Sequence, residues 1–169
     1  MTIFLIYLLF FLILLTAAYG AISAAPWLPT KNRDISRMIA LAEIKAGDKV
    51  YDLGCGDGRL VFAAAKKGAE AVGIEIFILP YLYAKIKSYF QPRTKILFGD
   101  MFNLSVADAD VVFIFLMSKS YQKLLIKLEK ELKAGSRVVC SCWPIENWQN
   151  KLKKIDQPTN SLPLFLYII

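Results

Sequence analysis

The chain has 169 residues, a formal net charge of +7 and a hydrophobic content of 56%. A length of this order accommodates one folded domain with a single core and excludes a second. The absence of histidine excludes histidine-based triads and histidine-rich metal sites, and the three cysteines lack the Cys-x-x-Cys spacing of a zinc site and any sign of a disulfide framework. We therefore expect no metal.

An uncharged apolar segment opens the chain. No charged side chain occurs in residues 1–30, and residues 3–25 are apolar over the length that a helix needs to cross a bilayer. We expect a retained transmembrane anchor at residues 1–25. The alternative is a cleaved signal peptide, which the small residues at 21–25 favour and the lack of a basic leading region disfavours.

Positive charge follows the anchor directly, at Lys31, Arg33 and Arg37. The positive-inside rule therefore predicts that the folded domain faces the cytoplasm. Between the anchor and the folded domain, residues 26–33 form a linker that is stiff because it contains two prolines. Trp27 in this linker suits the headgroup region of the membrane. The domain itself occupies residues 34–169 and begins with a helix over about 34–43.

A glycine-rich loop follows the first predicted strand, at 49–53. Its sequence is Asp52-Leu53-Gly54-Cys55-Gly56-Asp57-Gly58-Arg59, and a helix over 59–67 comes next. Such a loop offers unpaired backbone N–H groups and the positive end of a helix dipole, which suits a nucleotide or an amino-acid carboxylate. The Gly-x-Gly-x-Gly spacing differs from the Gly-x-Gly-x-x-Gly fingerprint and disfavours NAD.

Acidic residues lie at the ends of the next two predicted strands. The strand at 70–76 carries Glu75 about twenty residues after the loop, where a carboxylate binds ribose hydroxyls in nucleotide-binding α/β folds. A helix over 80–90 leads to a strand at 94–98, which runs into Gly99-Asp100-Met101. Asp100 is then placed to meet an adenine amine.

The remaining elements continue an alternating α/β pattern. The apolar run at 110–116 is typical of a central strand covered on both faces, and a helix over 119–133, a strand at 136–142 and a last strand within 162–169 follow. This alternation predicts a parallel sheet. Two cysteines two positions apart in the strand at 136–142 are expected to be buried on the same face, Cys140 and Cys142.

Three features of the chain resemble, in order, the first three cofactor motifs of the class I S-adenosylmethionine-dependent methyltransferases. They are Asp52 with the three glycines, Glu75, and Asp100. The chain is also similar to the small membrane-anchored protein-lysine methyltransferases of the ATP synthase c-subunit and adenine nucleotide translocase type, and to their prokaryotic relatives. That similarity covers about residues 26–148 and lies in the apolar N-terminus, Pro26-Trp27-Leu28-Pro29, the glycine loop and Ala63-Ala64-Ala65-Lys66-Lys67-Gly68.

The resemblance implies an α/β fold with a Rossmann-like, seven-stranded methyltransferase sheet. The sheet would be mostly parallel with an antiparallel last strand, and one N-terminal transmembrane helix would precede it. The implied cofactor is S-adenosylmethionine. The implied cofactor-binding residues are Asp52, Gly54, Cys55, Gly56, Asp57, Gly58, Glu75, Asp100 and Met101.

Methyl transfer from a sulfonium is an in-line displacement whose leaving group departs without a proton, so a dedicated base is optional. A lysine ammonium, with a pKa of about 10.4 in water, must lose a proton first, and desolvation beside a cation lowers that pKa. The candidates for a catalytic role are Asp57, Thr30 and Tyr81. Three further aromatic residues are candidates for seating the amine, with simple packing as the alternative: Trp27, Tyr83 and Trp143.

The anchor restricts the acceptor to molecules near the cytoplasmic leaflet, so the first hypothesis is lysine methylation of a membrane protein. The alternatives are a lipid, quinone or other small-molecule methyltransferase, an RNA methyltransferase, or a membrane-tethered binding module without catalysis. The net positive charge of the chain favours RNA as the methyl acceptor. Against it, enzymes that methylate base amines usually carry an Asn/Asp-Pro-Pro-Tyr-like tetrapeptide where this chain has Leu116-Met117-Ser118-Lys119.

Overall fold

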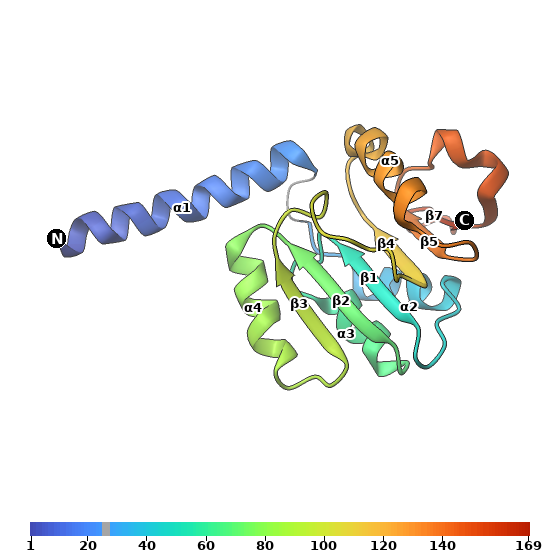
Figure 1. Cartoon of the computed structure of the whole chain (residues 1–169), viewed down its shortest axis with the longest axis horizontal. Helices are drawn as coiled ribbons and strands as arrows, with labels where there is room; N and C mark the ends of the chain where they lie inside the picture. Colours follow the sequence, from blue (N-terminus) through green and yellow to red (C-terminus); the bar gives the residue numbers. More distant parts are fainter. Residues whose placement is uncertain (25–27) are drawn as a thin grey trace.

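Seven strands form one sheet at the centre of the molecule (Figure 1), in a computed structural model that describes residues 1–24 and 28–169. Their spatial order is β3-β2-β1-β4-β5-β7-β6, and all are parallel except β7, which runs antiparallel to both of its neighbours. The strands are β1 (Lys49–Leu53), β2 (Glu70–Glu75), β3 (Thr94–Phe98), β4 (Val111–Ile114), β5 (Arg137–Ser141), β6 (Leu152–Asp156) and β7 (Leu164–Ile168). The predicted fold class is confirmed.

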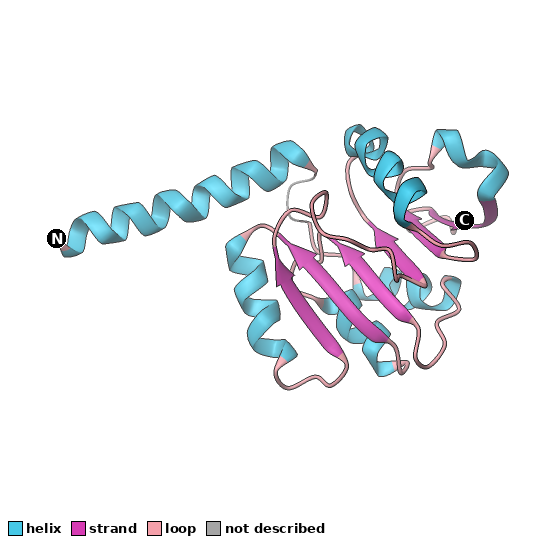
Figure 2. Cartoon of the chain, viewed as in Figure 1, coloured by secondary structure: helices cyan, strands magenta, loops and turns pink. Residues whose placement is uncertain are grey.

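Helices cover both faces of this sheet, and one helix projects beyond it (Figure 2). On one face lie α2 (Asn32–Leu41), α3 (Arg59–Lys66) and α4 (Ile78–Ser88). The other face carries α5 (Tyr121–Glu131), and the projecting helix is α1 (Thr2–Ser23). Two short 3-10 helices complete the chain, η1 (Ser118–Ser120) and η2 (Glu146–Lys151).

The core has two apolar halves, one on each face of the sheet. In β4, Val111 and Phe113 pack toward α2 and α3, whereas Val112 and Ile114 pack toward α5. Successive side chains of a strand point to opposite faces, so a strand covered on both sides must be apolar at every position. The apolar run in the sequence therefore predicts a central strand correctly.

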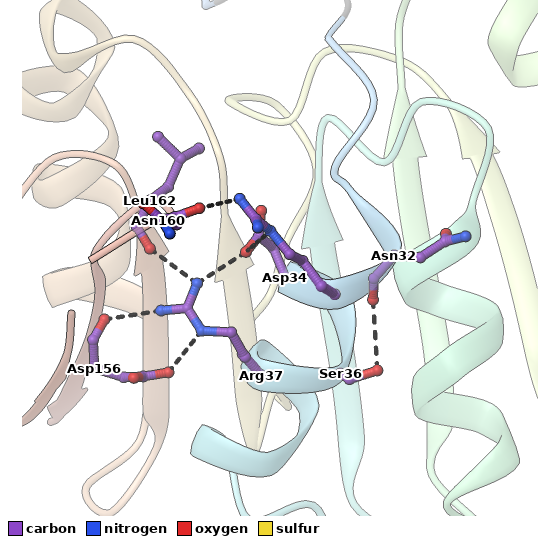
Figure 3. A network of polar contacts seen from close by, with 8 residues as sticks. Asn32, Asp34, Ser36, Arg37, Asp156, Asn160 and Leu162 are labelled. Atoms are coloured by element: carbon purple, nitrogen blue, oxygen red, sulfur yellow. Dashed lines mark hydrogen bonds and ion pairs between the residues drawn. The ribbon is translucent and has the colours of Figure 1, made fainter. Parts of the chain in front are cut away.

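Arg37 attaches α2 to the far edge of the sheet (Figure 3). Its Nε donates a hydrogen bond to Asp156 Oδ2 at 2.9 Å, and its Nη1 donates to Asp34 Oδ1 at 2.8 Å and to the Leu162 carbonyl at 3.0 Å. Arg33 beside it donates to the carbonyl of Asn160. The start of the domain is thereby held to both β6 and the β6–β7 connection.

Most elements lie close to their predicted positions. β1 and β3 have the predicted bounds, and α4 begins at Ile78, two residues before the prediction, with Pro80 in its first turn, where a missing N–H costs nothing. The helix predicted over 119–133 is divided into η1 and α5. The sequence pattern does not locate β6, because Lys153 and Lys154 read as part of a basic cluster.

The expectation for Cys142 is wrong. β5 ends at Ser141, and Cys142 has a φ of 79°, so the chain leaves the strand there in a left-handed conformation. Cys140 is fully buried in the strand as expected, but Cys142 is only partly buried and does not share its environment. A positive φ at a residue other than glycine has no clear signal in the sequence.

Gly73 in β2 should not tolerate a side chain. A Cβ at this position would lie 2.6 Å from Cys55 Sγ and 2.9 Å from Val61 Cγ2. We expect Gly73→Ala to lower the free energy of unfolding by about 1–3 kcal/mol, measured by denaturation of the detergent-solubilised chain. Adding Cys55→Ala should restore part of the loss, because it removes the nearest atom. A Gly73→Ala protein as stable as the parent would contradict this packing.

Candidate active site

A cavity of about 290 Å³ lies at the carboxyl ends of the parallel strands, where α/β folds place their ligands. Residues from the end of α1, the segment after it, the glycine loop and the ends of β2 to β5 contribute to its wall. The lining residues are Ala17, Gly20, Ala21, Ser23, Ala24, Leu28, Pro29, Thr30, Asp52, Gly54, Cys55, Gly56, Asp57, Arg59, Leu60, Ile74, Glu75, Ile76, Phe77, Gly99, Asp100, Met101, Phe115, Leu116, Met117, Cys142, Trp143 and Leu162.

Glu75 fixes the glycine loop. Its Oε2 accepts a hydrogen bond from the Gly56 N–H at 2.7 Å, and its Oε1 accepts from the N–H groups of Ile76 and Phe77 at 2.8 and 2.7 Å. Burial raises the pKa of Glu75, and these three donors oppose that rise. One buried carboxylate thus joins the loop after β1 to the end of β2.

Gly58 shows why the loop requires glycine. It is the N-cap of α3 with a φ of 78°, and a Cβ would lie 2.9 Å from the Phe62 ring and 3.2 Å from Ala84. A side chain there would be strained and would also push α3 away from α4. The loop can therefore approach a ligand with its backbone.

Asp52 lies at the end of β1, is only 7% exposed and lines the cavity. Within residues 1–24 and 28–169 its carboxylate accepts no hydrogen bond, and burial, with the charges of Glu75 and Asp57, raises its pKa to about 7. A buried carboxylate without a partner favours a cationic ligand. S-adenosylmethionine carries a sulfonium and an ammonium group, so the residues present fit it.

Asp57 is paired rather than free. Arg59 donates to its carboxylate from Nε at 2.9 Å and from Nη2 at 2.6 Å, and Arg59 Nη1 donates to the Thr30 carbonyl at 2.8 Å. Burial alone would raise the pKa of Asp57, but the hydrogen bonds from Arg59 lower it. An ionised carboxylate that is already paired is a weak base, which disfavours Asp57 as a catalytic base. The Asp57–Arg59 pair instead holds the segment at Thr30 against the glycine loop.

The end of α1 forms one wall of the cavity, which the sequence does not reveal. The Ala24 carbonyl accepts a hydrogen bond from Ser120 Oγ at 2.8 Å and from the Met117 N–H at 3.3 Å. The Tyr19 hydroxyl donates to Asp100 Oδ2 at 2.8 Å, and the Phe102 N–H donates to Asp100 Oδ1 at 2.9 Å. The apolar N-terminal helix is therefore part of the site.

The structure brings most of the predicted site residues together. Eight of the nine cofactor candidates line the cavity, as do Thr30 and Trp143, whereas Gly58 caps α3 beside it. Tyr81 does not: its ring packs on that of Phe98, with centroids 5.1 Å apart, between α4 and β3. Tyr83 is exposed on the outer side of α4, and Trp27 lies outside the described residues. Tyr81 is thus removed from the candidates for catalysis.

Comparison with known proteins agrees with this geometry. Residues 52–152 match the family described as the ANTKMT methyltransferase domain. A protein-lysine N-methyltransferase of Saccharolobus islandicus is 37% identical over 150 residues, which cover 85% of this chain and 93% of the relative. An ATP synthase c-subunit lysine N-methyltransferase of Rattus norvegicus is 31% identical over 126 residues, covering 73% of this chain and 58% of the relative. The chain thus spans little more than half of the rat protein.

A solved structure has the same fold. An RNA methyltransferase from Salinibacter ruber, in complex with S-adenosyl-L-homocysteine, superposes with a TM-score of 0.78 at 29% sequence identity. The match covers 84% of this chain and 94% of that one. S-adenosylhomocysteine is the product that methyl transfer leaves from S-adenosylmethionine, so a cofactor of this class fits the fold.

The affinity for S-adenosylmethionine should fall as the pH falls through about 7. A cationic ligand favours the ionised form of Asp52, whose pKa without ligand is about 7, so binding at lower pH must first remove a proton. Between pH 8 and pH 6 we expect a loss of about tenfold in affinity, measured by calorimetry on the solubilised chain.

Asp52→Asn should bind weakly at pH 8 and lose this pH dependence. The chain has no histidine, and the remaining acids beside Asp52 are Glu75, held by three backbone donors, and Asp57, held by Arg59. An affinity of the parent that stays constant from pH 6 to pH 8 would show that Asp52 does not contact the cationic ligand.

Proposed function

This chain belongs to the ANTKMT methyltransferase domain family and is an S-adenosylmethionine-dependent methyltransferase, and from this premise we propose that it methylates lysine side chains of a membrane-associated protein. The observation that carries the proposal is the position of the cavity, whose wall includes the end of a helix that can cross a bilayer. The names of the Saccharolobus and rat relatives support a lysine acceptor.

The proposed anchor is α1. It has 22 residues with a mean hydropathy of 2.5 over its most apolar window, and residues 2–12 are exposed. In length and composition it is sufficient to span a membrane. The cations that follow at Lys31, Arg33 and Arg37 favour a cytoplasmic domain, where S-adenosylmethionine is made. The division into anchor (1–25), linker (26–33) and catalytic domain (34–169) is part of this proposal.

The residues that would hold S-adenosylmethionine surround the glycine loop. The loop would approach it with its backbone, Asp52 would face its positive charge, and Glu75, Asp100 and Met101 would complete the site. The bound cofactor supplies a sulfonium methyl group that a nucleophile can displace.

The acceptor would enter on the side of the cavity away from these acids. The cavity-lining residues that follow β4 and β5 are uncharged there, among them Met117, Cys142 and Trp143. Such a surface desolvates an incoming ammonium and lowers its pKa, so the amine loses its proton to water before it attacks. Alignment and desolvation then supply the catalysis, and a dedicated base is not needed.

RNA is the second candidate acceptor, because the Salinibacter structure is that of an RNA methyltransferase. The chain's charge of +7 suits a polyanion. The proposed anchor, however, would confine the cavity to the membrane surface. A lipid or quinone acceptor fits the anchor equally well, so the test must separate protein, lipid and RNA.

We expect methyl label to enter membrane protein when the solubilised chain is incubated with labelled S-adenosylmethionine, host membranes and host RNA. Acid hydrolysis of the protein fraction should release the label as methyl-lysine. Glu75→Gln should lose the activity, because an amide cannot accept all three of the hydrogen bonds that hold the loop.

Glu146→Gln is the matched control, since Glu146 is exposed and lies outside the cavity. It should retain full activity. Label confined to the lipid extract, or to RNA, would overturn the lysine proposal while leaving the methyltransferase assignment intact.

A further inference from the structure

The outer face of α4 is apolar although it faces solvent. Leu79, Leu82, Tyr83 and Ile86 follow the i, i+3, i+4, i+7 spacing of one helix face and are 46–61% exposed. The opposite face of the same helix packs on the sheet through buried residues such as Ala84. Because α4 is apolar on both sides, one of its sides has no partner among residues 1–24 and 28–169.

The apolar surface continues past the end of α4. Tyr89 and Phe90 follow the helix and are 75% and 79% exposed. Residues 76–98 contain four cations and no carboxylate. These cations are Lys85, Lys87, Arg93 and Lys95. A large exposed apolar patch of this kind marks an interaction site, and its charge selects an anionic partner.

The position of α1 identifies that partner. α1 contacts α4, and the Ile78 N–H at the start of α4 donates to Thr16 Oγ1 of α1 at 3.4 Å. Figure 1 shows α1 leaving the domain on the side where α4 lies, with α4 running across the direction of α1. Because α4 lies across α1 at the level of Thr16, within the apolar helix, an α1 that enters a bilayer brings the outer face of α4 to the membrane.

We propose that the outer face of α4, with Tyr89 and Phe90, is a second membrane-contact surface that rests on anionic lipid beside α1. This inference rests on the proposed role of α1 as the anchor. Aromatic and aliphatic side chains with neighbouring lysines are the composition of a helix lying in a membrane interface. Two contacts instead of one would fix the tilt of the domain, and hence the height above the bilayer at which a lysine can reach the cavity.

The test places a tryptophan on this surface. Ile86→Trp is compared with Ile126→Trp, because Ile126 is also an exposed isoleucine (72%, against 61% for Ile86) and lies on α5, on the opposite face of the sheet. Both full-length variants are reconstituted in vesicles containing about 30% anionic phosphatidylglycerol, with the lipid chains brominated near the headgroups. Flotation of the vesicles first reports whether α1 holds the protein to the bilayer.

In protein that floats, the added fluorescence of Ile86→Trp should fall by about half or more through bromine quenching, and that of Ile126→Trp should not. Equal, weak quenching of both variants in floating protein would overturn the membrane contact while leaving the anchor intact. Protein that does not float would overturn the anchor as well. Shielding of Ile86→Trp from aqueous quencher without bromine quenching, together with a dimeric mass, would assign the surface to a second copy of the chain and overturn the lipid proposal.

Discussion

The hydrogen bonds at the Ala24 carbonyl determine how the parts of this molecule relate to one another. Met117, which directly precedes η1, and Ser120, the last residue of η1, hold the last turn of α1 against the carboxyl ends of the strands. Gly20 is buried in the same contact, where a Cβ would lie 3.3 Å from Ile76. The apolar helix therefore closes a side of the cavity, so the segment proposed as the anchor also forms part of the site.

Three carboxylates meet at the glycine loop, and each has a different environment. Glu75 accepts three backbone hydrogen bonds and organises the loop, while Asp57 is neutralised by Arg59 and holds the segment at Thr30. Asp52 alone of the three has no donor among the described residues, and burial, with the charges of Glu75 and Asp57, raises its pKa. Of the three, the Asp52 carboxylate is therefore the one whose charge a cationic ligand can neutralise. The cavity-lining residues that follow β4 and β5 are uncharged by contrast, which suits the proposed amine acceptor, because the amine must arrive without its proton.

Local signals in the sequence predict the fold well and place most of the cofactor candidates at one cavity. Glycines at positive φ, apolar runs and acids at strand ends are properties of short segments, so the loop, Glu75 and Asp100 can be placed without a structure. Features that depend on tertiary contacts are missed. Tyr81 follows β2 in the sequence yet turns toward Phe98, β6 carries lysines that hide its strand pattern, and nothing local in α1 shows that its last turn lines the cavity.

The central claim is that the end of α1 belongs to the cofactor site, and two alanines one turn apart test it. Ala21 lines the cavity, whereas Ala18 is exposed on α1. Binding of S-adenosylhomocysteine to the reconstituted full-length chain should weaken by about tenfold or more in Ala21→Leu, because the larger side chain fills the cavity. Ala18→Leu should bind as the parent does. Equal affinities for the parent, Ala18→Leu and Ala21→Leu would contradict the claim and leave α1 as an anchor alone.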